Sequence, residues 1–299
     1  MRCRWVFFAF FLGLVTPLAV LPAQRISLDS VSVADTSLRH VIRLRDGSTL
    51  VGRITAVTGD SVKVRLDQGE LVLARSGISG VRQVPATAFR NGEFWFENPH
   101  PTRLLFSSTA FPLEKGTGYY SNTWLFIHTF AAGITDRFTL GGGATTIPGI
   151  AFNQNLFYLL PKYTVISRPR AQFALGALVG VLPFNIDDFD DDFASAGLVY
   201  GVGTVGTRES NVSLGAAWGY ANDQVTDRPG IMLGGQGRIT RRVSLISENW
   251  FFPNGDGTES VLSYGLRFLG ENISVDLAWI KPLGAGDHGI PWLGFAFRF

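Results

Sequence analysis

The last seven residues, Leu293-Gly294-Phe295-Ala296-Phe297-Arg298-Phe299, alternate strictly between large apolar side chains and small or polar ones. Successive side chains of an extended strand point to opposite faces, so this run has one apolar face. The same alternation recurs in residues 171–181, 212–220 and 273–279. We therefore predict a sheet with one apolar face and one face of small or polar groups.

Runs of this kind continue through residues 102–299, separated by turn signals. They predict twelve strands, near residues 102–110, 117–132, 136–148, 154–167, 170–183, 194–207, 210–220, 229–239, 241–251, 258–269, 271–280 and 290–299. Their connections alternate between tight turns and longer loops. An even number of strands with short turns at one end and long loops at the other is typical of bacterial outer-membrane barrels. The predicted fold is all-β, an antiparallel up-and-down transmembrane β-barrel over residues 102–299.

The C-terminal alternation also resembles the terminal strand of outer-membrane barrel proteins. That strand is recognised by the barrel-insertion machinery. This resemblance implies an insertion signal at Phe295, Phe297 and Phe299, with outer-membrane lipid and the barrel-insertion machinery as partners. The stretches 98–103, 111–113, 115–120 and 133–136 resemble an uncharacterised family of Gram-negative barrel proteins, which implies no particular activity.

Aromatic residues give a second indication of a membrane barrel, because such barrels carry aromatic girdles at both membrane surfaces. Phe138, Phe268 and Phe299 fall near predicted tight turns. The aromatic residues near predicted long loops are Trp218, Tyr220, Trp250, Phe251, Trp279 and Trp292.

The composition agrees with this fold. Of 299 residues, 46% are hydrophobic, 13% aromatic and only 17% charged, which excludes a disordered chain. The 35 glycines and 24 phenylalanines are more typical of a β protein than of a helical one.

Residues 1–23 are predicted to be a secretory signal peptide. They contain the basic residues Arg2 and Arg4, an apolar run, and the small residue Ala23 at the cleavage site. Pro17 argues against the alternative, a retained membrane helix. Cleavage removes Cys3, the only cysteine, together with Arg2 and Arg4. The 26 basic residues thereby fall to 24, equal to the number of acidic residues. The mature chain is therefore not expected to bind polyanions generally, and its expected location is the cell outer membrane.

Residues 24–39 are assigned as an N-terminal extension, and residues 40–84 as a small periplasmic β domain with short strands and turns such as Asp46-Gly47. The glycine-bent second strand, with Gly52, Ile54 and Val57, resembles the Sm-like/SH3-like barrels. Many Sm-like proteins bind RNA, but export argues against nucleic acid as a partner. A periplasmic protein, the cell wall or the barrel itself are the partners considered for this domain. Residues 85–101, which include Pro99 and Pro101, are predicted to be a linker.

Charged side chains on strands are expected to face the lumen, because a charge facing lipid at mid-depth costs about 2 to 4 kcal/mol. The lumen candidates are Lys162, Gln236, Arg238, Glu248, Arg267, Asp276 and Arg298. Four basic and two acidic groups slightly favour anions. The alternative is an internal salt-bridge network that closes the barrel, and the sequence leaves the choice open.

Other motifs give no expected catalytic, metal or cofactor site. Residues 201–206 match G-x-G-x-x-G but precede a turn and a strand rather than a helix. The four histidines are scattered. A weak Ca²⁺ candidate, alternatively a solvated acidic loop tip, comprises Asp187, Asp188, Asp190, Asp191 and Asp192.

The predicted function is a passive small-solute channel or transport barrel without catalysis. One alternative is a closed structural or anchoring barrel that binds a protein or the cell wall. Further alternatives are a lipid-modifying or proteolytic barrel enzyme, testable at His128 or His288, and a soluble secreted barrel.

Overall fold

The computed structural model describes residues 38–90, 93–151, 154–182, 194–221, 224–255, 257–283 and 289–299. The chain divides into two compact units with a boundary between Trp95 and Phe96. The predicted signal peptide and almost all of the N-terminal extension lie outside the described residues, as does the acidic stretch 187–192. Among the described residues, no helix is long and apolar enough to cross a membrane.

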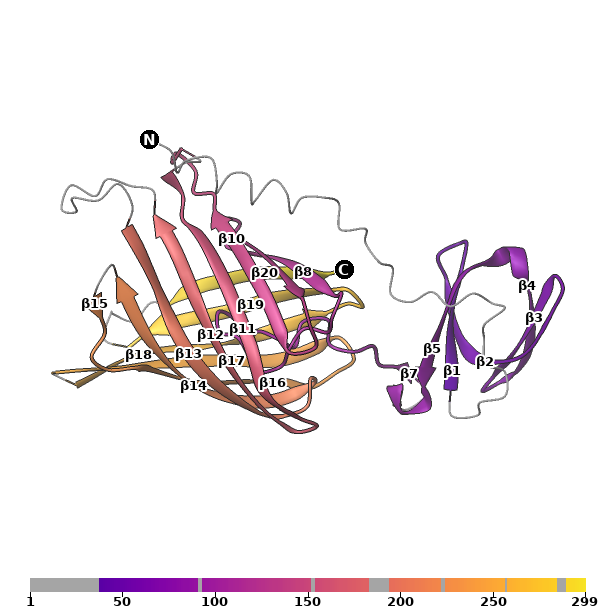
Figure 1. The fold of residues 1–299 in the computed structure, drawn as a ribbon. Coiled ribbons are helices and arrows are strands. Elements are labelled where there is room, and N and C mark those ends of the chain that lie inside the picture. The colour runs from indigo at the N-terminus through magenta and orange to yellow at the C-terminus, as the bar shows by residue number, and fades with distance from the viewer. Residues whose placement is uncertain are drawn as a thin grey trace. The chain divides into compact units, whose positions relative to one another are not determined.

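The first unit is a five-stranded antiparallel sheet (Figure 1). Its strands are β1 (Leu38–Leu44), β2 (Thr49–Thr58), β3 (Ser61–Leu66), β4 (Gly69–Ala74) and β5 (Ile78–Pro85), in the order β4-β3-β2-β1-β5. Its core is formed by Ile42, Ile54, Val62, Val64, Ile78 and Val81. A small hairpin of β6 (Phe89–Arg90) and β7 (Glu93–Phe94) follows, within the stretch predicted to be a linker. The resemblance to Sm-like barrels stays a prediction.

Two glycines shape this sheet. Gly47 adopts φ +87° in the turn after Asp46, whose carboxylate accepts hydrogen bonds from the Ser48 amide (2.8 Å) and hydroxyl (2.6 Å). These bonds lower the pKa of the Asp46 carboxyl. A Cβ at Gly52 would lie 2.6 Å from Cγ1 of Val64, so only glycine allows β2 to pack this closely on β3.

The second unit is a closed barrel of twelve antiparallel strands, which confirms the predicted fold class. The strands are β8 (Gly118–Thr123), β9 (Ile127–Gly133), β10 (Phe138–Thr145), β11 (Phe157–Arg168), β12 (Ala171–Leu182), β13 (Ala194–Gly206), β14 (Ser210–Ala221), β16 (Gly230–Arg238), β17 (Val243–Asn254), β18 (Gly257–Leu269), β19 (Ile273–Pro282) and β20 (Ile290–Arg298). Consecutive strands pair, and β20 pairs with β8 from Gly294↔Thr123 to Arg298↔Tyr119 to close the barrel. The two-residue β15 (Gln224–Val225) extends the end of β14.

The structure has twelve barrel strands, but two of the predicted strands, at 102–110 and 117–132, differ from those observed. The predicted strand at 102–110 is wrong, since these residues form no strand and lie inside the barrel. The predicted strand at 117–132 is two strands, β8 and β9, joined by a turn at 124–126. Trp124 and Leu125 adopt φ values of 51° and 67° there, a conformation usually marked by Gly or Asn, so the sequence carries no turn signal.

The barrel has two distinct ends. At the short-turn end, the connections 134–137, 169–170, 207–209, 239–242 and 270–272 are two to four residues long. At the long-loop end lie the longer connections 146–156, 183–193, 222–229 and 283–289. Two connections at this end, 124–126 and 255–256, are short, so the predicted alternation of turn length is not complete.

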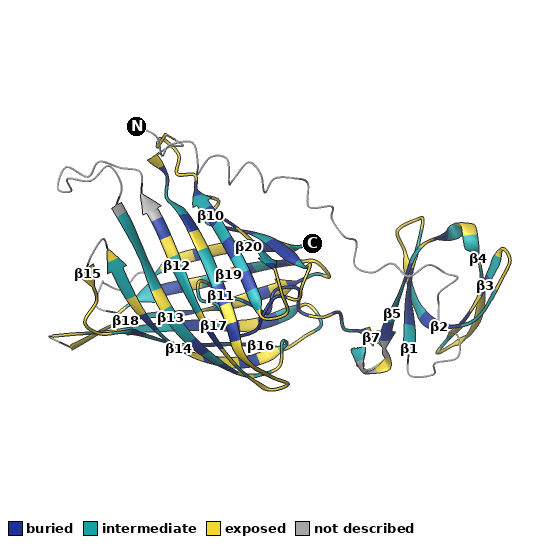
Figure 2. Cartoon of the chain, in the orientation of Figure 1, coloured by how far each residue is buried: buried dark blue, intermediate teal, exposed yellow. Residues whose placement is uncertain are grey.

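The strand faces follow the predicted alternation, visible as alternating exposed and buried bands in Figure 2. The outer face is apolar, with Val199 51%, Leu214 59% and Tyr264 62% exposed. Four charged strand residues, Lys162, Glu248, Arg267 and Asp276, are all buried inside. The remaining charged strand residues lie close to strand ends: Arg168, Arg238, Glu259, Lys281 and Arg298.

The first unit is expected to lose stability as pH falls. His40 is fully buried, and its Nδ1 accepts a hydrogen bond of 3.1 Å from the Ile54 amide, which requires an unprotonated nitrogen. Burial, and secondarily the charge of Arg53, lower the pKa of His40. Below pH ~6.5 the unfolded chain therefore binds a proton that the folded unit resists, so stability present above that pH is lost.

Native-state hydrogen exchange of the Ile54 amide, corrected for its intrinsic rate, should show protection that falls between pH 7.5 and 5. His40→Gln keeps an acceptor for that amide but does not titrate, and should remove the pH dependence. Protection that is flat with pH in the unmodified chain would contradict this assignment.

Candidate functional site inside the barrel

The barrel interior is occupied by residues 96–117, here called the inner segment, which lead into β8 (Figure 1). Its Leu104, Leu105 and Ala110 are at most 1% exposed. They belong to one apolar cluster with inward-facing strand residues, namely Ala174, Val202, Met232, Ile246, Ile280 and Trp292. The unit's main core is therefore inside the barrel and includes the inner segment.

The inner segment folds back on itself as a narrow hairpin. The Thr109 amide donates to the Thr102 carbonyl (3.0 Å), and the Leu104 amide to the Ser107 carbonyl (2.8 Å). Between these bonds, Arg103 and Ser108 form an isolated antiparallel bridge. The tip of the hairpin is therefore at residues 104–107.

Glu248 of β17 holds this tip. Its carboxylate accepts hydrogen bonds from the backbone amides of Leu105 (2.9 Å), Phe106 (2.9 Å) and Ser107 (3.1 Å). It also accepts bonds from the Ser107 hydroxyl (2.6 Å) and from the indole of Trp250 (2.8 Å). Three consecutive amides aimed at one carboxylate form an anion-binding turn, and bonds to an ionised acceptor are stronger than neutral ones.

Lys162 of β11 binds both legs of the hairpin. Its ammonium donates to the carbonyls of Thr109 (3.0 Å) and Phe111 (2.9 Å), and lies 3.5 Å from that of Thr102. Ala110, on the second leg, is bound by two strand hydroxyls. Thr204 Oγ1 accepts a hydrogen bond from the Ala110 amide (2.8 Å), and Thr164 Oγ1 donates one to the Ala110 carbonyl (3.0 Å). The buried charge of Lys162 is thus met by backbone dipoles rather than by a carboxylate.

Arg267 of β18 binds the first leg and pairs with Asp276 of β19. The pair is bidentate, with Nε–Oδ1 at 2.6 Å and Nη2–Oδ2 at 2.9 Å, and both side chains are at most 1% exposed. The remaining guanidinium hydrogens bond the carbonyls of His100 (3.1 Å), Arg103 (3.1 Å) and Leu104 (2.8 Å), and Gln236 Oε1 (3.0 Å). Such a fully bonded buried pair fixes the backbone that it touches.

Both ends of the inner segment leave the barrel at the short-turn end. Arg238 bonds the Phe96 carbonyl (2.6 Å) and Glu209, and Glu209 accepts from the Asn98 amide (2.7 Å). On the other leg, Glu114 lies between two guanidinium groups, those of Arg298 (3.4 Å) and Arg208 (3.5 Å).

The tip faces the long-loop end. Phe106 is 53% exposed, and its ring makes edge contacts with Trp292 (centroids 4.3 Å apart) and Trp124 (5.9 Å). Trp292 is only 2% exposed, so its predicted place in a lipid-facing girdle is wrong: it alternates onto the inner face of β20. Trp218 and Trp279, 39% and 42% exposed, do face outward.

The structure places five of the seven lumen candidates, Lys162, Gln236, Glu248, Arg267 and Asp276, in one buried set inside the barrel. Arg238, with a side chain 1% exposed, and Arg298, with a side chain 25% exposed, lie at its short-turn end. Lys162, Arg238, Glu248 and Arg267 bond the backbone of the inner segment, Gln236 and Asp276 support Arg267, and Arg298 pairs with Glu114. Of the insertion-signal residues, Phe297 is exposed and Phe295 half-buried on β20, while Phe299 follows the strand.

Sequence reasoning missed the inner segment itself. The predicted linker ends at residue 101, inside the first leg, and the predicted strand at 102–110 runs across the tip into the second leg. Pro99 and Pro101 are typical of a linker, yet both are buried. The available clue was the number of charged lumen candidates on strands, which need partners inside a closed barrel.

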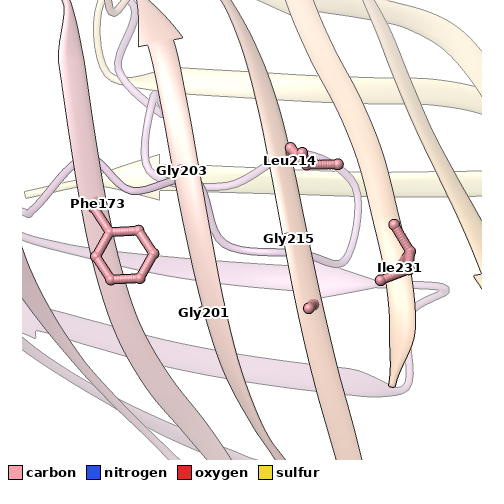
Figure 3. Close-up of a pocket in the computed structure, with 7 residues that line it drawn as sticks. Phe173, Gly201, Gly203, Leu214, Gly215 and Ile231 are labelled. Atoms are coloured by element: carbon pink, nitrogen blue, oxygen red, sulfur yellow. The ribbon is translucent and has the colours of Figure 1, made fainter. Parts of the chain in front are cut away.

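The outer face carries one shallow apolar groove of about 280 Å³ (Figure 3). Gly201 and Gly203 on β13 leave it open between Phe173 on β12 and Leu214 on β14. These two glycines are the start and middle of the G-x-G-x-x-G match, and they lie on a strand in contact with other strands. This placement gives no support to a nucleotide site.

The described histidines form no catalytic arrangement. His128 of β9 contacts Tyr120 Oη (2.8 Å), Asn122 Nδ2 (3.2 Å) and Thr146 Oγ1 (2.8 Å), with no carboxylate to orient it. His288 and the weak Ca²⁺ candidate at 187–192 lie outside the described residues. Within the described part of the chain, no three His, Cys, Asp or Glu residues gather as metal ligands.

No protein-family model matches the chain. No curated protein matches it either. Among solved structures it is similar to the KdgM porin, at 9% identity and a TM-score of 0.44, over 61% of this chain and 99% of the porin. It is also similar to OmpT of Vibrio cholerae and to a Salmonella typhi OmpF complex with daunomycin, each at 10% identity and a TM-score of 0.33, over 88% of this chain and 95% of theirs. At these scores, the similarities do not identify a function.

Glu248→Gln should loosen the tip of the inner segment. The substitution keeps the shape but removes the charge and one acceptor oxygen, so the amides of residues 105–107 lose charge-assisted bonds worth about 1.5–3 kcal/mol each. Hydrogen exchange of these amides should rise by about tenfold or more relative to the unmodified chain.

The matched control is Glu259→Gln, which removes the same charge at the exposed end of β18 and should leave these amides unchanged. If both variants exchange like the unmodified chain, the Glu248 carboxylate does not hold the tip.

Proposed function

We propose that this chain is an outer-membrane β-barrel whose lumen is closed by its own inner segment, and that solute passes only when the segment is displaced. The observation that carries the proposal is the set of oppositely charged anchors, Glu248 and Lys162, that hold a hairpin across the middle of the barrel. This replaces the predicted open channel by a gated one.

Membrane insertion is supported by the outer face. A transmembrane β-strand needs about 9–11 residues, and β11, β12 and β13 have 12, 12 and 13. Exposed Leu, Val and Tyr side chains cover the strands outside, and the charges in mid-strand point inside. A soluble barrel would gain nothing from exposing this apolar face to water.

The orientation follows from the predicted signal peptide and the short turns, which face the periplasm in outer-membrane barrels. The first unit and both ends of the inner segment would then be periplasmic. A hairpin inserted from one side can be withdrawn to that side without threading either end through the barrel. The gate would therefore open toward the periplasm.

A closed anchoring barrel is the second candidate, and the same interior supports it. The described part of the lumen contains a packed apolar cluster and a bidentate buried ion pair, as expected of a permanent core. The two candidates differ in whether the inner segment moves.

Planar-bilayer recording of refolded residues 24–299 tests the proposal, after heat-modifiable gel migration confirms the fold. The unmodified barrel should be mostly closed. The double variant Lys162→Met/Glu248→Gln removes both anchors and should raise the open probability by about tenfold or more. Lys281→Met/Glu259→Gln makes the same charge change near strand ends at the long-loop end and should behave like the unmodified chain.

A folded Lys162/Glu248 double variant that stays silent would exclude gating and leave the anchoring barrel. Equal, continuous conductance in all three proteins would show that the inner segment is no barrier.

A further inference from the structure

An open cavity of about 460 Å³ with a mixed polar and apolar lining is found at the short-turn end of the barrel. Its walls are the end of β11 with Ser167 and Arg168, the β13–β14 turn with Arg208, and the inward-facing Gln172 of β12. Its floor is Phe111 and Pro112 of the inner segment, both buried. The cavity is thus built from three parts of the fold that are distant in sequence.

The cavity is cationic. Within the described residues, the guanidinium of Arg168 has no carboxylate within 4.0 Å, and the same is true of the adjacent Arg170. Arg208 has only the long contact of 3.5 Å to Glu114, which is itself half-exposed and shared with Arg298. The nearby acid Glu209 is already engaged by Arg238 and the Asn98 amide. Positive charge therefore exceeds negative charge around the opening.

The lining also sets the chemistry of a ligand. Guanidinium groups offer paired N–H donors that match the oxygens of phosphate or carboxylate, and Ser167 adds a hydroxyl. The Phe111 ring lies 6.0 Å from the Arg208 guanidinium and gives the floor an apolar surface. The volume lies in the range of small-molecule sites.

We propose that this cavity binds a small organic anion, with a phosphate or carboxylate between Arg168 and Arg208 and an apolar part on Phe111 and Pro112. The site itself does not depend on the proposed gating. A bound anion would compete with Glu114 for Arg208, and so would weaken one contact that holds the inner segment at its exit from the barrel.

Calorimetric titration of the refolded chain in zwitterionic detergent tests the site, with phenyl phosphate, inorganic phosphate and chloride as probes at equal ionic strength. Phenyl phosphate should bind more tightly than inorganic phosphate, and chloride should give no saturable heat. Arg168→Gln and Arg208→Gln should each weaken phenyl phosphate binding about tenfold or more. Arg137→Gln, in the neighbouring 134–137 turn and not lining the cavity, should not.

Arg168→Gln is the decisive variant, because Arg168 is exposed at the end of β11 with no ion pair among the described residues, so its loss should leave the fold intact. Equal affinity in Arg168→Gln and Arg137→Gln, or no saturable phosphate binding at all, would overturn the proposal. A Lys162→Met/Glu248→Gln double variant that is silent in bilayers but still binds phenyl phosphate would instead reject the gate alone.

The ligand could come from the membrane or from solution, since a lipid headgroup and a soluble phosphate share this chemistry. Nanodiscs of phosphatidylglycerol and of phosphatidylcholine separate the two sources. If only phosphatidylglycerol blocks phenyl phosphate, the headgroup is the ligand. If neither lipid blocks it, the site takes a soluble anion.

Discussion

The buried charges of the strands are the constraint on which the rest of the barrel depends. Lys162, Glu248, Arg267 and Asp276 are turned away from the apolar outer face, and an unpaired charge inside costs several kcal/mol. Only Arg267 and Asp276 neutralise each other directly. The other two are satisfied by the backbone of residues 96–117, so the barrel and its inner segment stabilise each other.

This arrangement explains how a segment without regular secondary structure can be buried. Backbone N–H and C=O groups inside a protein must be paired, and a segment outside the sheet cannot use the strand ladder. Here the carbonyls bond Lys162 and Arg267, and the amides at the tip bond Glu248. The buried backbone of this segment is thereby paired without a strand ladder.

The two ends of the barrel differ in what they offer to a ligand. At the long-loop end, the half-exposed Phe106 meets Trp124 and the buried Trp292. At the short-turn end, arginines from separate strands and turns lie at the exit of the inner segment, with Glu114 shared between Arg208 and Arg298. The Glu114 contacts on the second leg are long and partly solvated. The contacts of Arg238 and Glu209 on the first leg are short, as are those of Glu248 at the tip.

The sequence by itself determined the barrel fold and the face of the sheet on which the charged side chains lie. Alternation such as that of Leu293–Phe299 assigns each side chain to a face through backbone geometry alone, and a charge at Arg267 or Asp276 can only face inward in lipid. The turn at Trp124-Leu125 escaped this reasoning because its positive φ values are stabilised by contacts with Pro291 and Trp292, far along the chain. Only the tertiary structure decided that residues 96–117 fill the lumen, because partners such as Lys162 and Arg267 lie on strands 51 to 167 residues away and no local pattern records such pairings.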